Sequence, residues 1–339
     1  MKTHHANLAL ALMLGLSSSA TAVAADAPQA VATKAAAAAN VKPVAADAQR
    51  VIPLQGAWNV RSFAGLQGRH GPIPADAFVR TADLGRLTDA DRDALAAAGV
   101  KLDIDLRTAD EEAQSPDLLA RDDRFDYQRI SLMGTEKMDL QKLMTSFPDS
   151  LGEAYVQWLG HSQPQFKQVF QRIAAQQDGT VLFHCTAGKD RTGIIAGLLL
   201  DLAGVPKAEI VHNYAISAHY LEGQPKDSAM NAQIMALVRQ NPEIGRKMAG
   251  MAGTAPDNME QFLAALHSQY GGAEGYLKSI GVSEQEIQQL KVRLGGAGGR
   301  VVTAGGGRHL DVQRLRECRR AAGITLSQAW PGSTGRASP

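Results

Sequence analysis

Residues 181–193 read Val181-Leu182-Phe183-His184-Cys185-Thr186-Ala187-Gly188-Lys189-Asp190-Arg191-Thr192-Gly193. A short apolar run ends at a histidine and a cysteine, and a polar loop follows it. From Ile194 to Ala203 the chain is apolar again, which is typical of a buried helix. A strand, a tight loop and a helix N-terminus in this order predict a site that binds an oxyanion.

The residue types in this loop favour covalent attack on a phosphate group. Successive backbone N–H groups, continued by the first turn of the helix, would donate to the phosphate oxygens, and the helix dipole adds partial positive charge there. Cys185 faces these donors, which favours a thiolate and makes it the candidate nucleophile. Arg191 carries a planar guanidinium that can bind two phosphate oxygens and stabilise the transition state.

Other residues of the loop have predicted supporting roles. Gly188 permits a backbone turn that other residues resist, and the Thr192 hydroxyl could donate to the cysteine sulfur as it leaves the phosphoenzyme. We therefore predict a supporting role for His184 and a set of substrate-binding residues, which is Thr186, Ala187, Gly188, Lys189 and Thr192. An inert cysteine buried at a strand end would explain none of these neighbours.

With these neighbours in place, the loop resembles that of the cysteine-dependent tyrosine phosphatase superfamily. Residues 188–193, Gly-Lys-Asp-Arg-Thr-Gly, resemble its atypical bacterial branch, secreted tyrosine or dual-specificity phosphatases that often also accept phosphoinositides. The resemblance covers roughly Val51 to Leu294, and its weaker matches are Asn59–Gly65, Phe78–Leu84, Asp105–Arg107 and Tyr276–Ser283. It implies a phosphorylated protein or a phosphoinositide as substrate, with no metal ion and no cofactor.

Composition agrees with an ordinary enzyme domain. The chain has 339 residues, 45% of them hydrophobic, which is enough for one core of enzyme size. Its formal net charge of +1 gives no overall field for nucleic acid, and an aromatic content of 5% offers little base stacking. We therefore expect no nucleic-acid partner.

The N-terminus has the pattern of a targeting segment. A short basic opening precedes the apolar run Leu8 to Leu16, and Ala22-Val23-Ala24 offers a small-residue cleavage site. The apolar run is too short to span a bilayer. We predict a signal peptide over residues 1–25, an Ala/Pro-rich linker over 26–49, and an exported protein that is periplasmic or secreted. No later stretch of the sequence is long and apolar enough for a membrane span.

Strand and helix patterns alternate through the predicted phosphatase domain, residues 50–294. Strands are expected near Phe78, over Val100 to Leu106, over Phe125 to Leu132 and before Cys185. The expected helices are 88–98, 151–159, 165–175, 194–203, 207–221, 228–239, 257–268, 273–280 and 283–294. This order predicts an α/β fold with a central, mostly parallel sheet flanked by helices and a helical C-terminal half.

Two stretches are less regular. Met133 to Pro148 shows no clear period, which is typical of a mobile loop or lid. Residues 295–339 are rich in glycine and arginine and contain only two acids, Asp311 and Glu317. This composition predicts a disordered tail, either a basic segment for an anionic surface or a dispensable extension.

Three aspartates compete as the acid that protonates the leaving oxygen. Asp190 lies inside the loop beside Arg191, where some members of the superfamily place an acid. Asp149 follows Phe147-Pro148 and resembles the Trp-Pro-Asp loop of other branches, although Pro-Asp is also a common turn dipeptide. Asp105 is the third candidate. Asp105 and Arg107 could have a supporting role beside the phosphate site or could equally form a structural ion pair. We predict Asp190.

Alternative interpretations remain open at this point. Lys189 could meet a second phosphate, which favours dual or phosphoinositide specificity, or could be a solvated lysine that balances Asp190. An inositol polyphosphate phosphatase would share the loop, and a non-catalytic phosphate-binding module would keep Arg191 without needing Cys185. A cysteine peptidase is disfavoured because His184 and Cys185 are adjacent on one strand and point to opposite faces.

Overall fold

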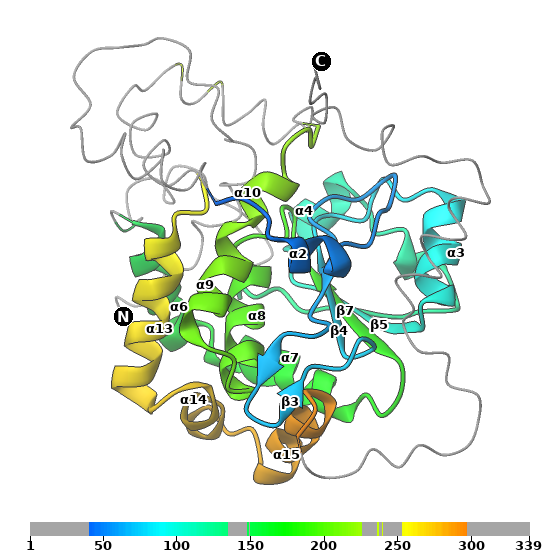
Figure 1. Cartoon of the computed structure of the whole chain (residues 1–339). Helices are drawn as coiled ribbons and strands as arrows, with labels where there is room; N and C mark the ends of the chain where they lie inside the picture. Colours follow the sequence, from blue (N-terminus) through cyan, green and yellow to red (C-terminus); the bar gives the residue numbers. More distant parts are fainter. Residues whose placement is uncertain are drawn as a thin grey trace, which may run out of the picture.

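A central sheet carries the loop, and helices cover both of its faces (Figure 1). The computed structural model describes residues 41–134, 148, 150–225, 236, 239 and 253–296. Within these residues the strands are β1 (Arg61–Ser62), β2 (Gln67–Gly68), β3 (Gly71–Pro72), β4 (Phe78–Thr81), β5 (Val100–Asp105), β6 (Asp126–Arg129) and β7 (Thr180–His184).

The helices among the described residues fall mainly in the second half of the chain. They are α2 (Ala45–Arg50), α3 (Asp89–Ala97), α4 (Ala109–Gln114), the 3-10 turn η3 (Leu119–Arg121), α6 (Leu151–His161), α7 (Gln163–Ala175), α8 (Arg191–Leu202), α9 (Lys207–Ala215), α10 (Ser217–Tyr220), α13 (Pro256–Tyr270), α14 (Ala273–Ser279) and α15 (Glu284–Arg293). The predicted mostly parallel α/β fold with a helical C-terminal portion is confirmed.

The strand that leads to Cys185 lies at the centre of the main sheet. The five strands have the order β1-β4-β7-β5-β6, with β7 parallel to both β4 and β5. β6 is also parallel to β5, and only β1 runs antiparallel to its neighbour. A strand buried on both faces needs apolar residues in succession, which explains the uninterrupted Val-Leu-Phe run of β7.

Side chains of β7 alternate between two cores. Phe183 and Cys185 belong to the larger core, which α6, α7, α8 and α13 cover, whereas Leu182 belongs to a smaller core beneath α3. Helix α8 lies among α9, α13 and the sheet and is buried along nearly its whole length (Figure 1). Such burial explains why its sequence is apolar on all sides.

Some local predictions hold and others need correction. Thr88 caps α3 as expected, with its hydroxyl accepting from Asp91 N at 3.1 Å. Helix α4 was not predicted, although Thr108 and Glu111 form a capping box at its start. Helix α2 lies inside the range predicted as linker, and its Asp47 contacts His212 of α9, so ordered structure begins before residue 50.

Several predictions fall on other parts of the chain. The signal peptide, nearly all of the 295–339 tail, most of the 133–148 loop and most of the expected 228–239 helix lie outside the described residues. Among the helices that the structure describes, none has the length and apolar character that crossing a membrane requires.

Candidate active site

The loop from Cys185 to Arg191 joins the end of β7 to the first residue of α8. Cys185 is fully buried and its thiol is free. Arg191 and Thr192, in the first turn of α8, are also fully buried. The strand, loop and helix N-terminus therefore take the arrangement that the sequence predicts for an oxyanion site.

Hydrogen bonds from outside hold the backbone carbonyls of the loop. Asn59 Nδ2 donates to the carbonyls of Ala187 and Gly188, at 3.0 Å each. Arg80 Nη2 donates to the same Gly188 carbonyl at 2.7 Å, and Asp83 N donates to the Thr186 carbonyl at 3.0 Å. Because the carbonyls are bound on the outside, the N–H groups of the loop are held in place for an anion before it arrives.

Gly188 is required at its position for two reasons. Its φ of 61° lies in the left-handed region that favours glycine. A Cβ there would also lie 2.2 Å from the Thr81 carbonyl oxygen, so the loop could not approach β4. The backbone turn predicted at this glycine is confirmed.

Glu111 of α4 holds the guanidinium of Arg191. Arg191 Nη1 donates to Glu111 Oε2 at 2.6 Å, and Nη2 donates to Oε1 at 2.7 Å. The Thr186 hydroxyl donates to the same Oε1 at 2.6 Å. Burial alone would raise the pKa of Glu111, but Arg191 and these donors lower it, so the pair stays ionised. Arg191 Nε has no hydrogen-bond partner among the described residues and remains available to a phosphate oxygen.

Two loop side chains with predicted roles also lie in the site. The Thr192 hydroxyl is buried and has no hydrogen-bond partner among the described residues, so its expected bond to the Cys185 sulfur is not formed here. Lys189 is only 4% exposed; its Nζ donates to the Gly253 carbonyl at 2.9 Å and lies 3.4 Å from Asp190 Oδ1. Because Lys189 is buried, it is not the solvated lysine of the second interpretation, but its ammonium group does lie beside the Asp190 carboxylate.

Comparisons with known proteins agree with this geometry. The tyrosine phosphatase family matches residues 52–295. The chain belongs to the tyrosine phosphatase family. A tyrosine-protein phosphatase of Nostoc commune is 82% identical over 306 residues, which cover 88% of this chain and 100% of that protein. The triple specificity protein phosphatase PtpB of Mycobacterium tuberculosis is 25% identical over 287 residues, 71% of this chain and 98% of that protein.

Asp190 of this phosphatase is buried and turned toward α6. Its Oδ1 accepts a short hydrogen bond from the Tyr155 hydroxyl, whereas its Oδ2 has no partner among the described residues. The carboxyl therefore lies within the loop, as predicted, with one oxygen held and the other free. Asp149, the alternative acid, lies outside the described residues.

His184 lies on the opposite face of the sheet from Cys185, among buried aspartates. Its Nε2 lies 3.0 Å from Asp117 Oδ2, 3.6 Å from Asp103 Oδ1 and 3.7 Å from Asp105 Oδ1. Burial disfavours the imidazolium, but Asp105, Asp103 and Asp117 outweigh it and raise the pKa of His184 to about 10. The opposite orientation of the two side chains agrees with the exclusion of a cysteine peptidase.

Arg107 completes this second cluster, so Asp105 and Arg107 form a structural ion pair. Arg107 Nε donates to Asp105 Oδ1 at 2.9 Å and Nη2 donates to Oδ2 at 2.8 Å. Burial raises the pKa of Asp105, but His184 and Arg107 lower it more strongly. An ionised carboxylate on the far face of the sheet favours this ion pair over a role for Asp105 as the leaving-group acid.

The same cluster contains the one group of possible metal ligands found among the described residues. The side chains of Asp103, Asp117 and His184 offer donor atoms within 4.8 Å of one another. A protonated imidazole has no free lone pair for a metal, and its positive charge already compensates the carboxylates. The raised pKa of His184 therefore favours an ionic cluster in this place.

Sequence patterns did not indicate a functional role for several residues of the site. Glu111, Arg80 and Tyr155 each hold the loop but lie far from it in sequence. The capping box from Thr108 to Glu111 could have indicated α4, but nothing local pairs Glu111 with Arg191. Asn59 lies in a segment matched to the family, although no role was assigned to it.

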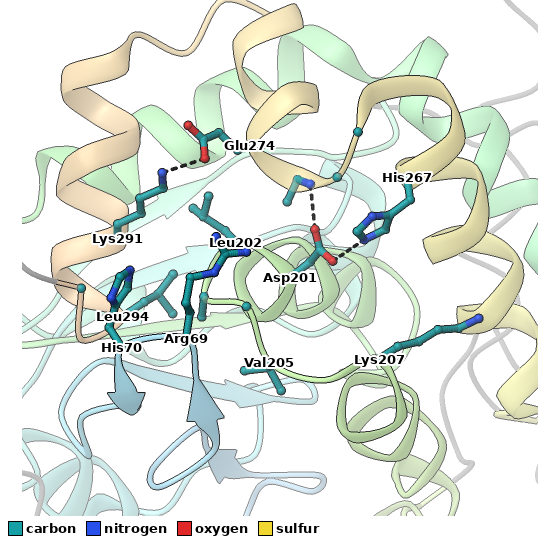
Figure 2. Close-up of a pocket in the computed structure, with 16 residues that line it drawn as sticks. Arg69, His70, Asp201, Leu202, Val205, Lys207, His267, Glu274, Lys291 and Leu294 are labelled. Atoms are coloured by element: carbon teal, nitrogen blue, oxygen red, sulfur yellow. Dashed lines mark hydrogen bonds and ion pairs between the residues drawn. The ribbon is translucent and has the colours of Figure 1, made fainter.

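A separate cleft of about 350 Å³ lies at the other end of α8 (Figure 2). Arg69 and His70, in the turn between β2 and β3, line it together with Lys291 of α15. Asp201 accepts from Ala273 N at 2.8 Å and lies 2.6 Å from His267 Nε2, and Glu274 binds Lys291 at 2.7 Å. None of the predicted site residues lines this cleft.

Proposed function

We propose that the protein hydrolyses phosphate monoesters of tyrosine in proteins through a cysteinyl-phosphate intermediate. One observation carries the proposal: the loop presents a buried cysteine beside an arginine whose Nη1 and Nη2 are held by Glu111 while Nε is free. A phosphate dianion in this loop would receive backbone N–H bonds, the dipole of α8 and the guanidinium charge. The name of the Nostoc commune relative, a tyrosine-protein phosphatase, supports phosphotyrosine as a substrate.

The first chemical step transfers the phosphoryl group to Cys185. The thiolate sulfur bonds to phosphorus while the bond from phosphorus to the ester oxygen breaks, and Asp190 gives its proton to that oxygen. Arg191 and the loop N–H groups stabilise the charge on the three equatorial oxygens.

The second step releases phosphate. A water molecule attacks phosphorus as the sulfur leaves, and its proton passes to the Asp190 carboxylate, which restores the acid. The Thr192 hydroxyl, which is buried beside the loop, can donate to the departing sulfur. Both steps balance without a metal or a cofactor.

The acid assignment is tested by the dependence of rate on the leaving group. Asp190→Asn should lower kcat on phosphotyrosine by about a hundredfold or more, and much less on an activated nitrophenyl phosphate whose leaving group needs no proton. Asp149→Asn should change neither rate. An equal loss on both substrates would give Asp190 a structural role, and a selective loss in the Asp149 variant would transfer the assignment to that residue.

The substrate range extends, in this proposal, to phosphoserine, phosphothreonine or phosphoinositides. Lys189 brings a buried positive charge to the loop, and a substrate with a second phosphate could compete with Asp190 for it. The name of PtpB, a triple specificity protein phosphatase, supports a range wider than one substrate class. A turnover panel of phosphotyrosine peptide, phosphoserine peptide and phosphoinositide vesicles tests it, and Lys189→Met should lose the phosphoinositide activity selectively. Turnover of phosphotyrosine alone would restrict the enzyme to that class.

Export of the enzyme is also part of the proposal. The basic opening, the apolar run and the Ala22-Val23-Ala24 site support cleavage near residue 25. Intact-mass measurement of protein from the exported fraction should give a chain that begins at or near Ala25 or Asp26. A chain in that fraction that still carries Met1 would contradict cleavage.

A further inference from the structure

Asp190 occupies the N-cap of α8 without capping the helix. Aspartate at this position usually accepts from the N–H groups of the first turn. Here the side chain makes no such bond. The carboxyl turns to Tyr155 on α6, which leaves the N–H groups of the first turn free for a phosphate. This departure from a common local preference indicates that the carboxyl has another role.

Three further side chains continue from Asp190 into the larger core. The Tyr155 hydroxyl donates to Asp190 Oδ1, and it lies 2.8 Å from the Tyr214 hydroxyl of α9. Asn258 of α13 donates through Nδ2 to the Tyr214 hydroxyl at 3.3 Å. Gly193 makes room for this arrangement, because a Cβ there would lie 3.0 Å from Tyr214 Cδ2. The chain thus links the loop to three helices.

The donors in this chain fix its direction. Tyr155 gives its single hydroxyl proton to Asp190 Oδ1, so the proton between the two tyrosines must come from Tyr214. Asn258 Nδ2 then donates to the Tyr214 oxygen at the far end of the chain. Both tyrosines are buried, and while Asp190 is a carboxylate neither bond can reverse without leaving two oxygens facing each other with no proton between them.

We propose that Asn258, Tyr214 and Tyr155 form a one-directional hydrogen-bond chain that positions Asp190 and assigns its acidic proton to Oδ2. Oδ1 receives Tyr155 and lies 3.4 Å from Lys189 Nζ, so it is the poorer place for a proton. Oδ2 is buried without a partner among the described residues. This inference rests on the proposed role of Asp190 as the acid, and it adds the positioning residues and the oxygen that delivers the proton.

The charged and titratable groups around Asp190 are compatible with this assignment. Lys189 of the loop and Tyr155 contact it directly, and Tyr214 of α9 and Arg191 of α8 interact with it electrostatically. Burial raises the pKa of Tyr155, and the Asp190 charge raises it further. The pKa of Tyr214 is raised for the same two reasons. Both phenols therefore keep their protons and remain donors across the working pH range.

Tyr155→Phe is the direct test, with Tyr276→Phe as its matched control. Tyr276 is equally buried and also loses one hydroxyl bond at α6, to the Leu159 carbonyl at 3.0 Å, but has no bond to Asp190. Tyr155→Phe should lower kcat about tenfold on phosphotyrosine and less than about twofold on a nitrophenyl phosphate. Tyr276→Phe should show neither change.

A second variant tests the direction without touching either tyrosine. Asn258→Asp replaces the donor by an acceptor, so Tyr214 would donate to residue 258 and leave Tyr155 facing an oxygen. The ratio of kcat on phosphotyrosine to kcat on nitrophenyl phosphate should fall by about threefold or more, as it does in Tyr155→Phe. Asn258→Gln keeps an amide donor and is the control. A thermal melt of each variant shows whether a change in kcat comes from unfolding.

The outcomes distinguish this inference from the proposed function. If Asp190→Asn is selective for poor leaving groups but Tyr155→Phe matches Tyr276→Phe in the ratio of kcat on the two substrates, the positioning chain is wrong and the acid assignment stands. If Asp190→Asn slows both substrates equally, the acid assignment fails and the chain falls with it. If Tyr155→Phe does not fold, the ratio of kcat on the two substrates in Asn258→Asp decides.

Discussion

The positively charged side chains at the two ends of α8 differ in their burial and in their ion pairing. At the N-terminal end, Arg191 is fully buried and bound in a bidentate pair to Glu111. At the C-terminal end, Arg69, His70 and Lys207 are exposed around the cleft, and none of the three has an ion-pair partner among the described residues. The two places are about 18 Å apart, at 1.5 Å of rise per residue over the 12 residues of the helix.

This difference indicates why the buried N-terminal end of α8 is the better place for phosphate chemistry. A buried guanidinium with a fixed partner needs no reorganisation when a phosphate arrives, and the low dielectric strengthens its field. Exposed cations are screened by water and salt and must lose side-chain entropy to bind anything.

The largest effect is expected at the nucleophile. Cys185→Ser should abolish turnover, because a serine hydroxyl in the same place is a far weaker nucleophile than a thiolate. Binding of vanadate or phosphate should survive, since the loop carbonyls stay bound by Asn59 and Arg80 and Arg191 stays paired. Calorimetric titration and a turnover assay measure the two properties separately. Residual turnover close to that of the wild type would rule out the covalent mechanism.

Much of this end of the molecule could be predicted from sequence, because its signals are local. The apolar strand, the glycine in the loop and the buried helix all lie within about 20 consecutive residues, and each has a short-range pattern. The partners could not be predicted in the same way. Glu111 precedes Arg191 by 80 positions and Tyr155 precedes Asp190 by 35, and only the sheet order brings them together. The direction of Asp190 away from its own helix likewise depends on Tyr155, not on the loop sequence.

The next effect concerns the partner of Arg191. Glu111→Gln removes the charge and one of the two good acceptors, so kcat/KM should fall about a hundredfold, as for the loss of one preoriented donor. Because the pKa of Glu111 is lowered in the folded protein, the pair stabilises the fold above about pH 4.5 and this stability is lost as the pH falls below it. The gap in unfolding free energy between wild type and variant should therefore shrink in acid.

Asp83→Asn is the control for this variant. Asp83 also binds a buried arginine, Arg107, but on the far face of the sheet. Denaturant unfolding should show a loss of stability in both variants, whereas only Glu111→Gln should show the large loss of kcat/KM. Equal kinetic losses would mean that Glu111 acts through general stability.

A smaller effect is expected at an ion pair of intermediate burial. His212 Nε2 lies 2.8 Å from Asp47 Oδ2, with side chains 24% and 8% exposed. The hydrogen bond to Asp47 raises the pKa of His212, and His212 lowers the pKa of Asp47 against the effect of burial. The histidine contribution is complete below about pH 6.5 and is lost as the pH rises, and the aspartate contribution is lost as the pH falls below about 4.

His212→Gln should therefore cost about 1 kcal/mol of unfolding free energy near pH 5.5 and much less at pH 9. Denaturant unfolding across this pH range measures it. His267→Gln is the matched control from the cleft, because that histidine also binds an aspartate, Asp201, but is 57% exposed. A larger loss in His267→Gln would contradict the ranking of these contacts by burial. A negligible change in unfolding free energy in His212→Gln would show that this ion pair does not stabilise the packing of α2 on the domain.

The smallest effect is expected at the cleft itself. Arg69→Ala and Lys207→Ala, alone and together, should leave kcat/KM on a small phosphate ester within about twofold of the wild type, and unfolding free energy within about 0.5 kcal/mol. Both side chains are exposed, and a separation of about 18 Å is roughly twice the screening length at physiological salt. Measuring kcat/KM at both low and high salt makes this test more sensitive. If the charges at this end do reach the loop, the variants should differ from the wild type at low salt and converge with it at high salt. Such a salt-dependent gap would show that the two ends of α8 work together, and the contrast between a buried catalytic end and an open, inert end would be wrong.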